Sequence, residues 1–277
     1  MRTSKTASII IAFITIISFC GCAQGALQRR LTATHGAREY AWKDNTYDYT
    51  HVVLSCETPP NASKISFGTA LVYTDGRNDF STGNADYKRF CTALYARMPL
   101  CGGVFTLAGA YGPVRCDYTI HSASGESTSD EFAFSALYVK RYPLFNGYWL
   151  EPQLHFLFAR VNSDVSVADN GAIVQLERFD RAMGRLGLSI GKTVGNVNLR
   201  LRTALLHDLR GDLKVRLSTN GWERGHSVNL GGSWYRVGFG VDVRLQNGLS
   251  LFVILDKMWG GNVGANWQFN AGFSLDF

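Results

Sequence analysis

The last fifteen residues of the chain alternate between apolar and polar or small side chains without exception. Because successive side chains of a β-strand point to opposite faces, this period of two predicts a strand with one apolar and one polar face. The stretch is far longer than the strands of soluble proteins, which usually have about five or six residues. Its apolar positions are Val263, Ala265, Trp267, Phe269, Ala271, Phe273, Leu275 and Phe277.

The same alternation recurs upstream and predicts about twelve strands in an all-β fold. It is clear over 64–73, 132–138, 150–158, 185–191, 197–205 and 235–245. It is weaker near 90–98, 104–118 and 249–257, and weakest near 37–43 and 47–56. Apart from one segment near the N-terminus, no run of apolar residues approaches the roughly twenty that a membrane-spanning helix needs. Charged residues make up only 18% of the chain, which suits strands that are apolar on one face.

An alternating strand can belong to a soluble sandwich, with its apolar face in the core, or to a membrane barrel, with its apolar face in lipid. Two features of the strands themselves favour the barrel. Many predicted strands reach the length of about ten residues that a tilted strand needs to cross a bilayer. Aromatic residues gather near predicted strand ends, as an interfacial girdle requires. These aromatic residues are Tyr142, Tyr148, Trp149, Trp234, Tyr235 and Trp259.

The connections between strands alternate between short and long. Short turns are predicted at 98–102, 143–147, 194–196 and 246–248, and long polar loops at 75–86, 119–130, 161–178 and 208–227. Short turns at one end and long loops at the other are typical of outer-membrane barrels. The sequence therefore predicts an all-β, transmembrane, antiparallel up-and-down β-barrel of about 12 strands, whose two chain ends lie on the short-turn side.

The first residues differ from the rest of the chain. A basic start, an apolar run over 7–19 and small residues after it predict a secretory signal peptide over 1–25. A lipoprotein cut at Cys22 is the alternative, although the residues before it make a poor lipobox. Residues 26–35 are predicted to be a short linker or remnant helix, and residues 36–277 the barrel. Removal of the signal leaves four cysteines, which we interpret as small packing residues, with disulfides as the alternative.

Charged residues on the polar rows of the predicted strands are the candidate site. They are expected to line the lumen: Arg185, Arg200, Arg202, Arg236, Arg244, Glu151 and Asp242. One interpretation is a salt-bridged interior that neutralises itself, because a confined arginine needs an acidic partner. The other is a positively charged lumen that favours anions or holds an anionic segment.

No catalytic, cofactor-binding or metal-binding residues are predicted. Residues 187–193 resemble a phosphate loop, but only three residues separate the glycines where the motif needs four. Residues 210–212 spell an Arg-Gly-Asp tripeptide, which we interpret as a chance occurrence. His207 and Asp208 are adjacent on a predicted strand and therefore point to opposite faces. The six histidines show no metal-ligand spacing, so we expect no cofactor and no enzymatic activity.

From about residue 48 to the end, the chain resembles the C-terminal translocator (β) domain of autotransporters, the type V secretion family. The resemblance rests on the stretch 147–153 (Gly-Tyr-Trp-Leu-Glu-Pro-Gln), on 184–187 (Gly-Arg-Leu-Gly), on 234–240 (Trp-Tyr-Arg-Val-Gly-Phe-Gly) and on the closing strand 266–277. Asp75-Gly76 and the polar loop after it are also similar to that family, and Arg29-Arg30-Leu31 is similar to its last linker helix.

The resemblance implies a twelve-stranded barrel in the outer membrane of a Gram-negative bacterium, through which an N-terminal passenger is exported or displayed. It also implies that the barrel assembly machinery recognises a C-terminal signal, here Phe269, Ala271, Phe273, Leu275 and Phe277. The expected partners are outer-membrane lipid and that machinery. No nucleic acid is expected, and the barrel is expected to be a monomer.

About ten residues separate the predicted signal peptide from the first predicted strand, so we expect the passenger to be missing from this sequence. This motivates an alternative function, a passive pore or structural outer-membrane barrel without export activity. An outer-membrane hydrolase is a third hypothesis, which the sequence supports least because no acid and base residues converge.

Overall fold

The computed structural model describes residues 30–42, 45–80, 83–120, 123–219, 222–229, 231–261 and 264–276. The predicted signal peptide, residues 26–29 and Phe277 lie outside the described residues. No helix among the described residues is long and apolar enough to cross a membrane.

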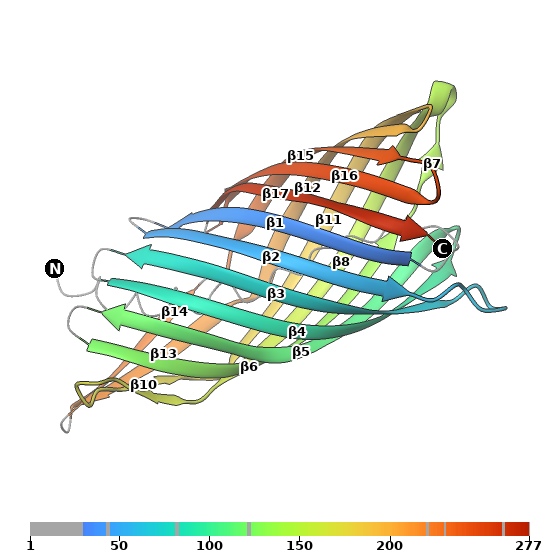
Figure 1. Cartoon of the computed structure of the whole chain (residues 1–277). Helices are drawn as coiled ribbons and strands as arrows, with labels where there is room; N and C mark the ends of the chain where they lie inside the picture. The colour runs from blue at the N-terminus through green and yellow to red at the C-terminus, as the bar shows by residue number, and fades with distance from the viewer. Residues whose placement is uncertain are drawn as a thin grey trace.

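Twelve long antiparallel strands form the wall of a closed barrel (Figure 1). They are β1 (Arg30–Trp42), β2 (Asn45–Glu57), β3 (Ser66–Phe80), β4 (Gly83–Leu100), β5 (Gly103–Ile120), β6 (Ala123–Val139), β8 (Tyr148–Ser163), β11 (Phe179–Val194), β12 (Val197–Arg210), β15 (Ser233–Arg244), β16 (Leu249–Gly260) and β17 (Gly264–Asp276). Each pairs with its neighbours along the chain, and pairing of β1 with β17 closes the ring. The predicted up-and-down barrel of about 12 strands is confirmed.

The first strand begins earlier than the sequence indicated. Residues 30–35, which we assigned to a linker or remnant helix, belong to β1 and pair along their length with both β17 and β2. Closure explains the difference, because in lipid the edges of β2 and β17 would otherwise present unpaired backbone groups. Only Leu31 and Ala33 among these residues are apolar, so backbone pairing and not a long side-chain pattern defines this strand.

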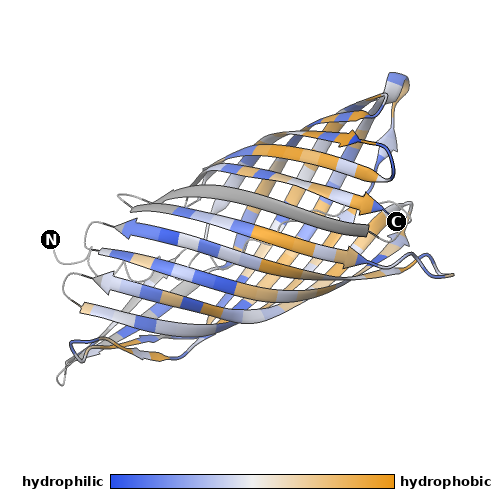
Figure 2. Cartoon of the chain, in the orientation of Figure 1, coloured by the Kyte–Doolittle hydropathy of each residue, from blue (hydrophilic) through white to orange (hydrophobic). Residues whose placement is uncertain are grey.

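The two faces of the wall carry opposite chemistry. On β17, the side chains of Trp267 and Phe269 are 49% and 41% exposed on the outer face, whereas Gln268 and Asn270 are buried at 3% and 0% on the lumen side. The same holds on β15, where Tyr235, Val237 and Phe239 are exposed. In Figure 2 the apolar residues gather over the middle of the strands and toward the short-turn end, and the long-loop end is mostly polar or neutral. The apolar faces therefore point outward, as a lipid-embedded barrel requires, and not into a sandwich core.

Two of the predicted girdle aromatics point the other way. Trp149 and Trp234 are only 4% exposed and lie on the lumen side. Tyr142, Tyr148, Tyr235 and Trp259 do face outward near strand ends. The prediction was wrong for the two tryptophans because the strand parity set by their outward neighbours, Leu150 and Tyr235, turns them inward.

The two ends of the barrel differ, and the four predicted short turns all lie at the same end as the start of β1 and the end of β17. The one at 143–147 contains the two-residue strand β7 (Tyr142–Pro143) and the 3₁₀ turn η2 (Phe145–Gly147). At the opposite end, most of the predicted loops 75–86 and 119–130 is strand, because β3 to β6 continue through them. Polar outward residues do not end a strand whose backbone is still paired.

The two remaining long connections build a second, four-stranded sheet. It consists of β9 (Val165–Val167), β10 (Ile173–Leu176), β13 (Asp212–Thr219) and β14 (Trp222–Asn229), in the order β14-β13-β10-β9. β9 lies along β6, and backbone hydrogen bonds on either side of β9 hold it there. The Asp164 amide donates to the Thr128 carbonyl at 3.0 Å, and the Asp169 amide donates to the Ser124 carbonyl at 2.9 Å. The wall of β3 to β6 is thereby extended at the long-loop end (Figure 1).

Candidate functional site

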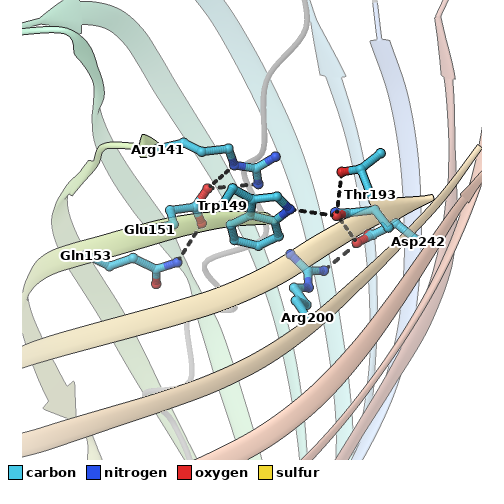
Figure 3. A network of polar contacts seen from close by, with 8 residues as sticks. Arg141, Trp149, Glu151, Gln153, Thr193, Arg200 and Asp242 are labelled. Carbon is cyan, nitrogen blue, oxygen red and sulfur yellow. Dashed lines mark hydrogen bonds and ion pairs between the residues drawn. The ribbon is translucent and has the colours of Figure 1, made fainter. Parts of the chain in front are cut away.

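Charged and polar side chains inside the barrel form a continuous network near the short-turn end (Figure 3). The carboxylate of Glu151 on β8 is its centre and is 2% exposed. It accepts a hydrogen bond from Nε of Arg141 at 2.9 Å and from the amide of Gln153 at 3.1 Å. Gln153 in turn accepts a bond of 3.1 Å from the guanidinium of Arg185 on β11. Each donor is thus held by a partner on its own or a neighbouring strand.

Trp149 carries the network across to the next strands. The guanidinium of Arg141 lies 3.9 Å from the centroid of its ring, and the indole N–H donates to Oδ1 of Asn198 at 3.0 Å. The Asn198 amide donates to Asp242 at 3.3 Å, and Arg200 donates to the other oxygen of Asp242 at 3.2 Å. The Thr193 hydroxyl also donates to Oδ1 of Asn198, at 3.4 Å. We call these residues the lumen network: Arg141, Trp149, Glu151, Gln153, Arg185, Thr193, Asn198, Arg200 and Asp242.

Beyond the lumen network, four further arginines of the lumen side form ion pairs with carboxylates. Arg202 binds Asp256 with two hydrogen bonds, and the Asp256 side chain is fully buried. The other pairs are Arg97–Glu57 at 2.8 Å, Arg89–Glu131 at 2.8 Å and Arg181–Asp208 at 2.9 Å. With Arg141–Glu151 and Arg200–Asp242, each of six arginines has a carboxylate partner, which offsets most of the positive charge that arginines bring to the interior.

Sequence reasoning missed the pairs on β2, β4 and β6. The rows that contain Arg89, Arg97 and Glu131 do alternate with outward positions, but small or polar outward residues weaken the pattern, as Thr92 and Ala96 do on β4. The two arginines of β4 could have been found from strand parity. Arg89 and Arg97 lie an even number of positions from Cys91 and Ala93, which are buried on the lumen side of the same strand.

Inward aromatic rings lie across inward glycines of neighbouring strands. Tyr95, Tyr87 and Tyr118 stand opposite Gly68, Gly76 and Gly125 in the strand registers. A Cβ atom at any of these glycines would collide with the ring opposite. The absence of a side chain therefore lets each ring lie flat against the wall, an arrangement that compensates for the poor strand propensity of glycine.

The predicted lumen residues are placed as follows. Glu151, Arg185, Arg200 and Asp242 belong to the lumen network, and Arg202 pairs with Asp256. Arg236 is 9% exposed on the lumen side of β15. Arg244 occupies the last position of β15, and its side chain is exposed at the rim.

The predicted C-terminal signal lies on the outward row of β17. Phe269 and Phe273 are exposed there, and Ala271 and Leu275 are half-buried between neighbours. This row faces lipid in the closed barrel.

The features set aside in the sequence do not converge in space. His207 is exposed and contacts Ser233, whereas Asp208 is buried against Arg181, so the two do not form a dyad. Residues 187–193 lie inside β11. The cysteines at 56, 91, 101 and 116 are free. Among the described residues, no group of histidine, cysteine and acidic side chains has the arrangement of a metal site.

The comparison with protein families decides what this barrel is. The model of the autotransporter beta-domain matches residues 29–256, which is most of the chain. The chain belongs to this family. Barrels of the family lie in the outer membrane of Gram-negative bacteria, and so does this one. The expectations on family, fold and location are therefore confirmed.

Sequence relatives and solved structures agree with the family. The chain is 30% identical over 139 residues to the pertactin autotransporter of Bordetella bronchiseptica, and 29% identical over 143 residues to the BrkA autotransporter of Bordetella pertussis. These matches cover 48% and 50% of this chain but only 15% and 14% of the relatives. The chain therefore matches only a small part of the length of these curated relatives.

Two solved barrels have the same fold. The translocator domain of the autotransporter NalP from Neisseria meningitidis superposes with a TM-score of 0.78 at 13% identity, covering 93% of this chain and 91% of that one. The beta domain of the Bordetella autotransporter BrkA gives a TM-score of 0.73 at 19% identity, covering 91% of this chain and all of that one.

Proposed function

We propose that this autotransporter β-domain exports or displays the segment that precedes β1. The position of β1 supports the proposal. Arg30 pairs with Asp276, so β1 starts at the short-turn end of the barrel, which faces the periplasm in outer-membrane barrels. A segment attached there reaches the cell surface only by crossing the barrel. The lumen suits such passage, because it offers hydrogen-bond partners and most of its arginines are paired with carboxylates.

Surface exposure of that segment tests the export role. An epitope with a protease site is inserted between residues 26 and 29, and the same insert in the turn at Gly195 and Asn196 is the control. We expect protease to cut the first insert in intact cells and the second only after the outer membrane is permeabilised. If the first insert is protected in intact cells while the barrel is folded, export is contradicted. Single-channel conductance without export would then favour a passive pore.

We propose further that residues 1–25 act as the signal peptide and that the finished barrel is a non-enzymatic monomer in lipid, with no nucleic-acid partner and no cofactor. The barrel assembly machinery would read the outward row of β17, with Phe277 as its last member. Phe273→Ser should lower the yield of folded barrel several-fold, because it places a polar group on that row. Ser274→Ala on the lumen side is the matched control. Equal yields of the two variants would contradict recognition of this row.

A further inference from the structure

The outer wall carries a groove between two rows of side chains. Its volume is about 590 Å³. One bank is a cross-strand row in which each residue stands opposite the next in the strand registers: Tyr138, Leu154, Leu186, Leu205 and Tyr235. The other bank includes Pro152, Leu188 and Thr203, which are also opposite one another. The first bank therefore crosses β6, β8, β11, β12 and β15 in sequence, and the second runs beside it on β8, β11 and β12.

Residues that turn inward explain the floor of this groove. Between the banks stand Gln153, Gly187 and Ala204, which are opposite one another in the registers and turn toward the lumen. Their backbone is therefore the floor on the outer side. Pro152 and Thr203 are short, so the second bank is low, and the hollow stays open along the row.

The groove has about the length of one acyl chain. Five strands span four inter-strand steps of about 4.8 Å, or roughly 19 Å. Two acyl chains end to end span the hydrocarbon core of about 30 Å, so one chain is about 15 Å long or more, and it can lie along a row that is oblique to the membrane because barrel strands are tilted. The row runs from near the short-turn end of β6 to near the long-loop end of β15.

The short-turn end of the groove is positively charged. Lys140 and Tyr142 line it there, with the Lys140 ammonium 5.0 Å from the Tyr142 ring centroid. Lys192 lies in the same way 4.7 Å from the ring of Tyr148. Among the residues that the structure describes, no carboxylate forms an ion pair with either lysine. Exposed tyrosines mark the level of the lipid headgroups, so both ammonium groups lie where lipid phosphates are found.

We propose that this groove binds one acyl chain of an anionic phospholipid from the periplasmic leaflet, with the lipid phosphate held at Lys140. The shape of the groove selects an acyl chain. The Lys140 ammonium selects a negatively charged headgroup, because the cationic group of a zwitterionic headgroup would repel the lysine. The inference rests on the membrane orientation given under the proposed function, but not on export.

Native mass spectrometry of the full chain tests the proposal. The barrel is loaded with equal amounts of phosphatidylglycerol and phosphatidylethanolamine of the same chain length. We expect phosphatidylglycerol to be retained about fivefold better, the contribution of about one lysine at a membrane surface. Lys140→Gln should remove most of this preference. Lys64→Gln, at the same end but in the β2–β3 connection, should keep it.

A second pair of variants tests the groove itself. Leu186→Trp fills the hollow and should lower retention of both lipids, whereas Leu251→Trp, on the outer face of β16, should not. Equal retention of the two lipids, or equal behaviour of Lys140→Gln and Lys64→Gln, overturns the proposal. So does a dimer that Leu186→Trp dissociates, because a second copy would then cover the groove. Protease exposure of the N-terminal insert is measured on the same variants, so failure of lipid binding and failure of export are separate results.

Discussion

The outer face and the lumen of this barrel come from the same strands but depend on different surroundings. On β17, Phe269 needs hydrocarbon around it, while Asn270, one residue on, is turned to the polar interior. On the outer face the apolar side chains need no specific partners, because lipid can accommodate any apolar shape. The lumen is a set of specific pairs, such as Arg202 with Asp256. The outer face therefore tolerates changes of shape but not of polarity, and the lumen tolerates neither.

The largest expected effect is the loss of one member of a lumen pair. Asp256→Asn leaves the Arg202 guanidinium without its carboxylate at a buried position, which should lower the free energy of unfolding by about 3–5 kcal/mol. Urea unfolding in lipid vesicles, followed by tryptophan fluorescence, measures it. The double variant Arg202→Met, Asp256→Leu should recover most of the loss. If Asp256→Asn is as stable as the parent, the lumen does not depend on pairing.

The next effect concerns the outer face and its depth in the membrane. Phe239 lies in the middle of β15, so Phe239→Arg places a charge near the bilayer midplane and should cost about 2–4 kcal/mol. Trp259→Arg, near the end of β16, should cost no more than about 1 kcal/mol. The same unfolding measurement compares the two. Equal costs would show that the outer face does not span the hydrocarbon.

A smaller effect is expected for a single hydrogen bond of the lumen network. Trp149→Phe keeps the stacking on Arg141 but removes the bond to Asn198, which should lower the free energy of unfolding by about 1 kcal/mol. Tyr148→Phe, an outward aromatic of the same strand, is the control and should have less effect. The reverse order would contradict a structural role for the inward tryptophan.

The smallest effect belongs to an outward ion pair above the apolar band. Two hydrogen bonds from Arg160 hold the pKa of the Asp180 carboxyl below its ordinary value. A lowered pKa means that the stabilisation is complete above about pH 4 and disappears as the pH falls through the lowered value. Asp180→Asn should therefore differ slightly from the parent at pH 6, and the difference should shrink as the pH falls below about 4. A difference that stays constant as the pH falls below about 4 would assign the effect to packing.

The sequence predicts the outer face well and the lumen only in part. Period-two alternation places Phe269 and Phe273 outward because lipid demands one continuous apolar row. The same rule could have predicted that Trp149 faces inward, because the adjacent Leu150 faces outward. The long-loop ends of the strands were harder to predict. Outward residues above the membrane, such as Asp75 and Arg77, are polar, although the backbone of β3 is still paired there.

The partners inside the lumen could not be predicted. Arg202 and Asp256 are 54 positions apart and lie on strands that are not neighbours. Alternation says that both face inward, but it does not give the register or the tilt that brings them together. The Arg89–Glu131 pair across β4 and β6 is a second case, where small outward residues on β4 also weakened the pattern of the row that contains Arg89.

Labelling from within the lipid tests the central claim most directly. The barrel is reconstituted in vesicles that contain a lipid-soluble photoreactive probe, and labelled residues of β15 and β17 are mapped by mass spectrometry. The structure predicts label at alternate positions, on Tyr235, Val237 and Phe239 and on Trp267, Phe269 and Phe273, and none on Gln268 or Asn270 between them. Label on the inward positions, or protection of the three outward residues of β17, would contradict a barrel whose apolar face lies in lipid.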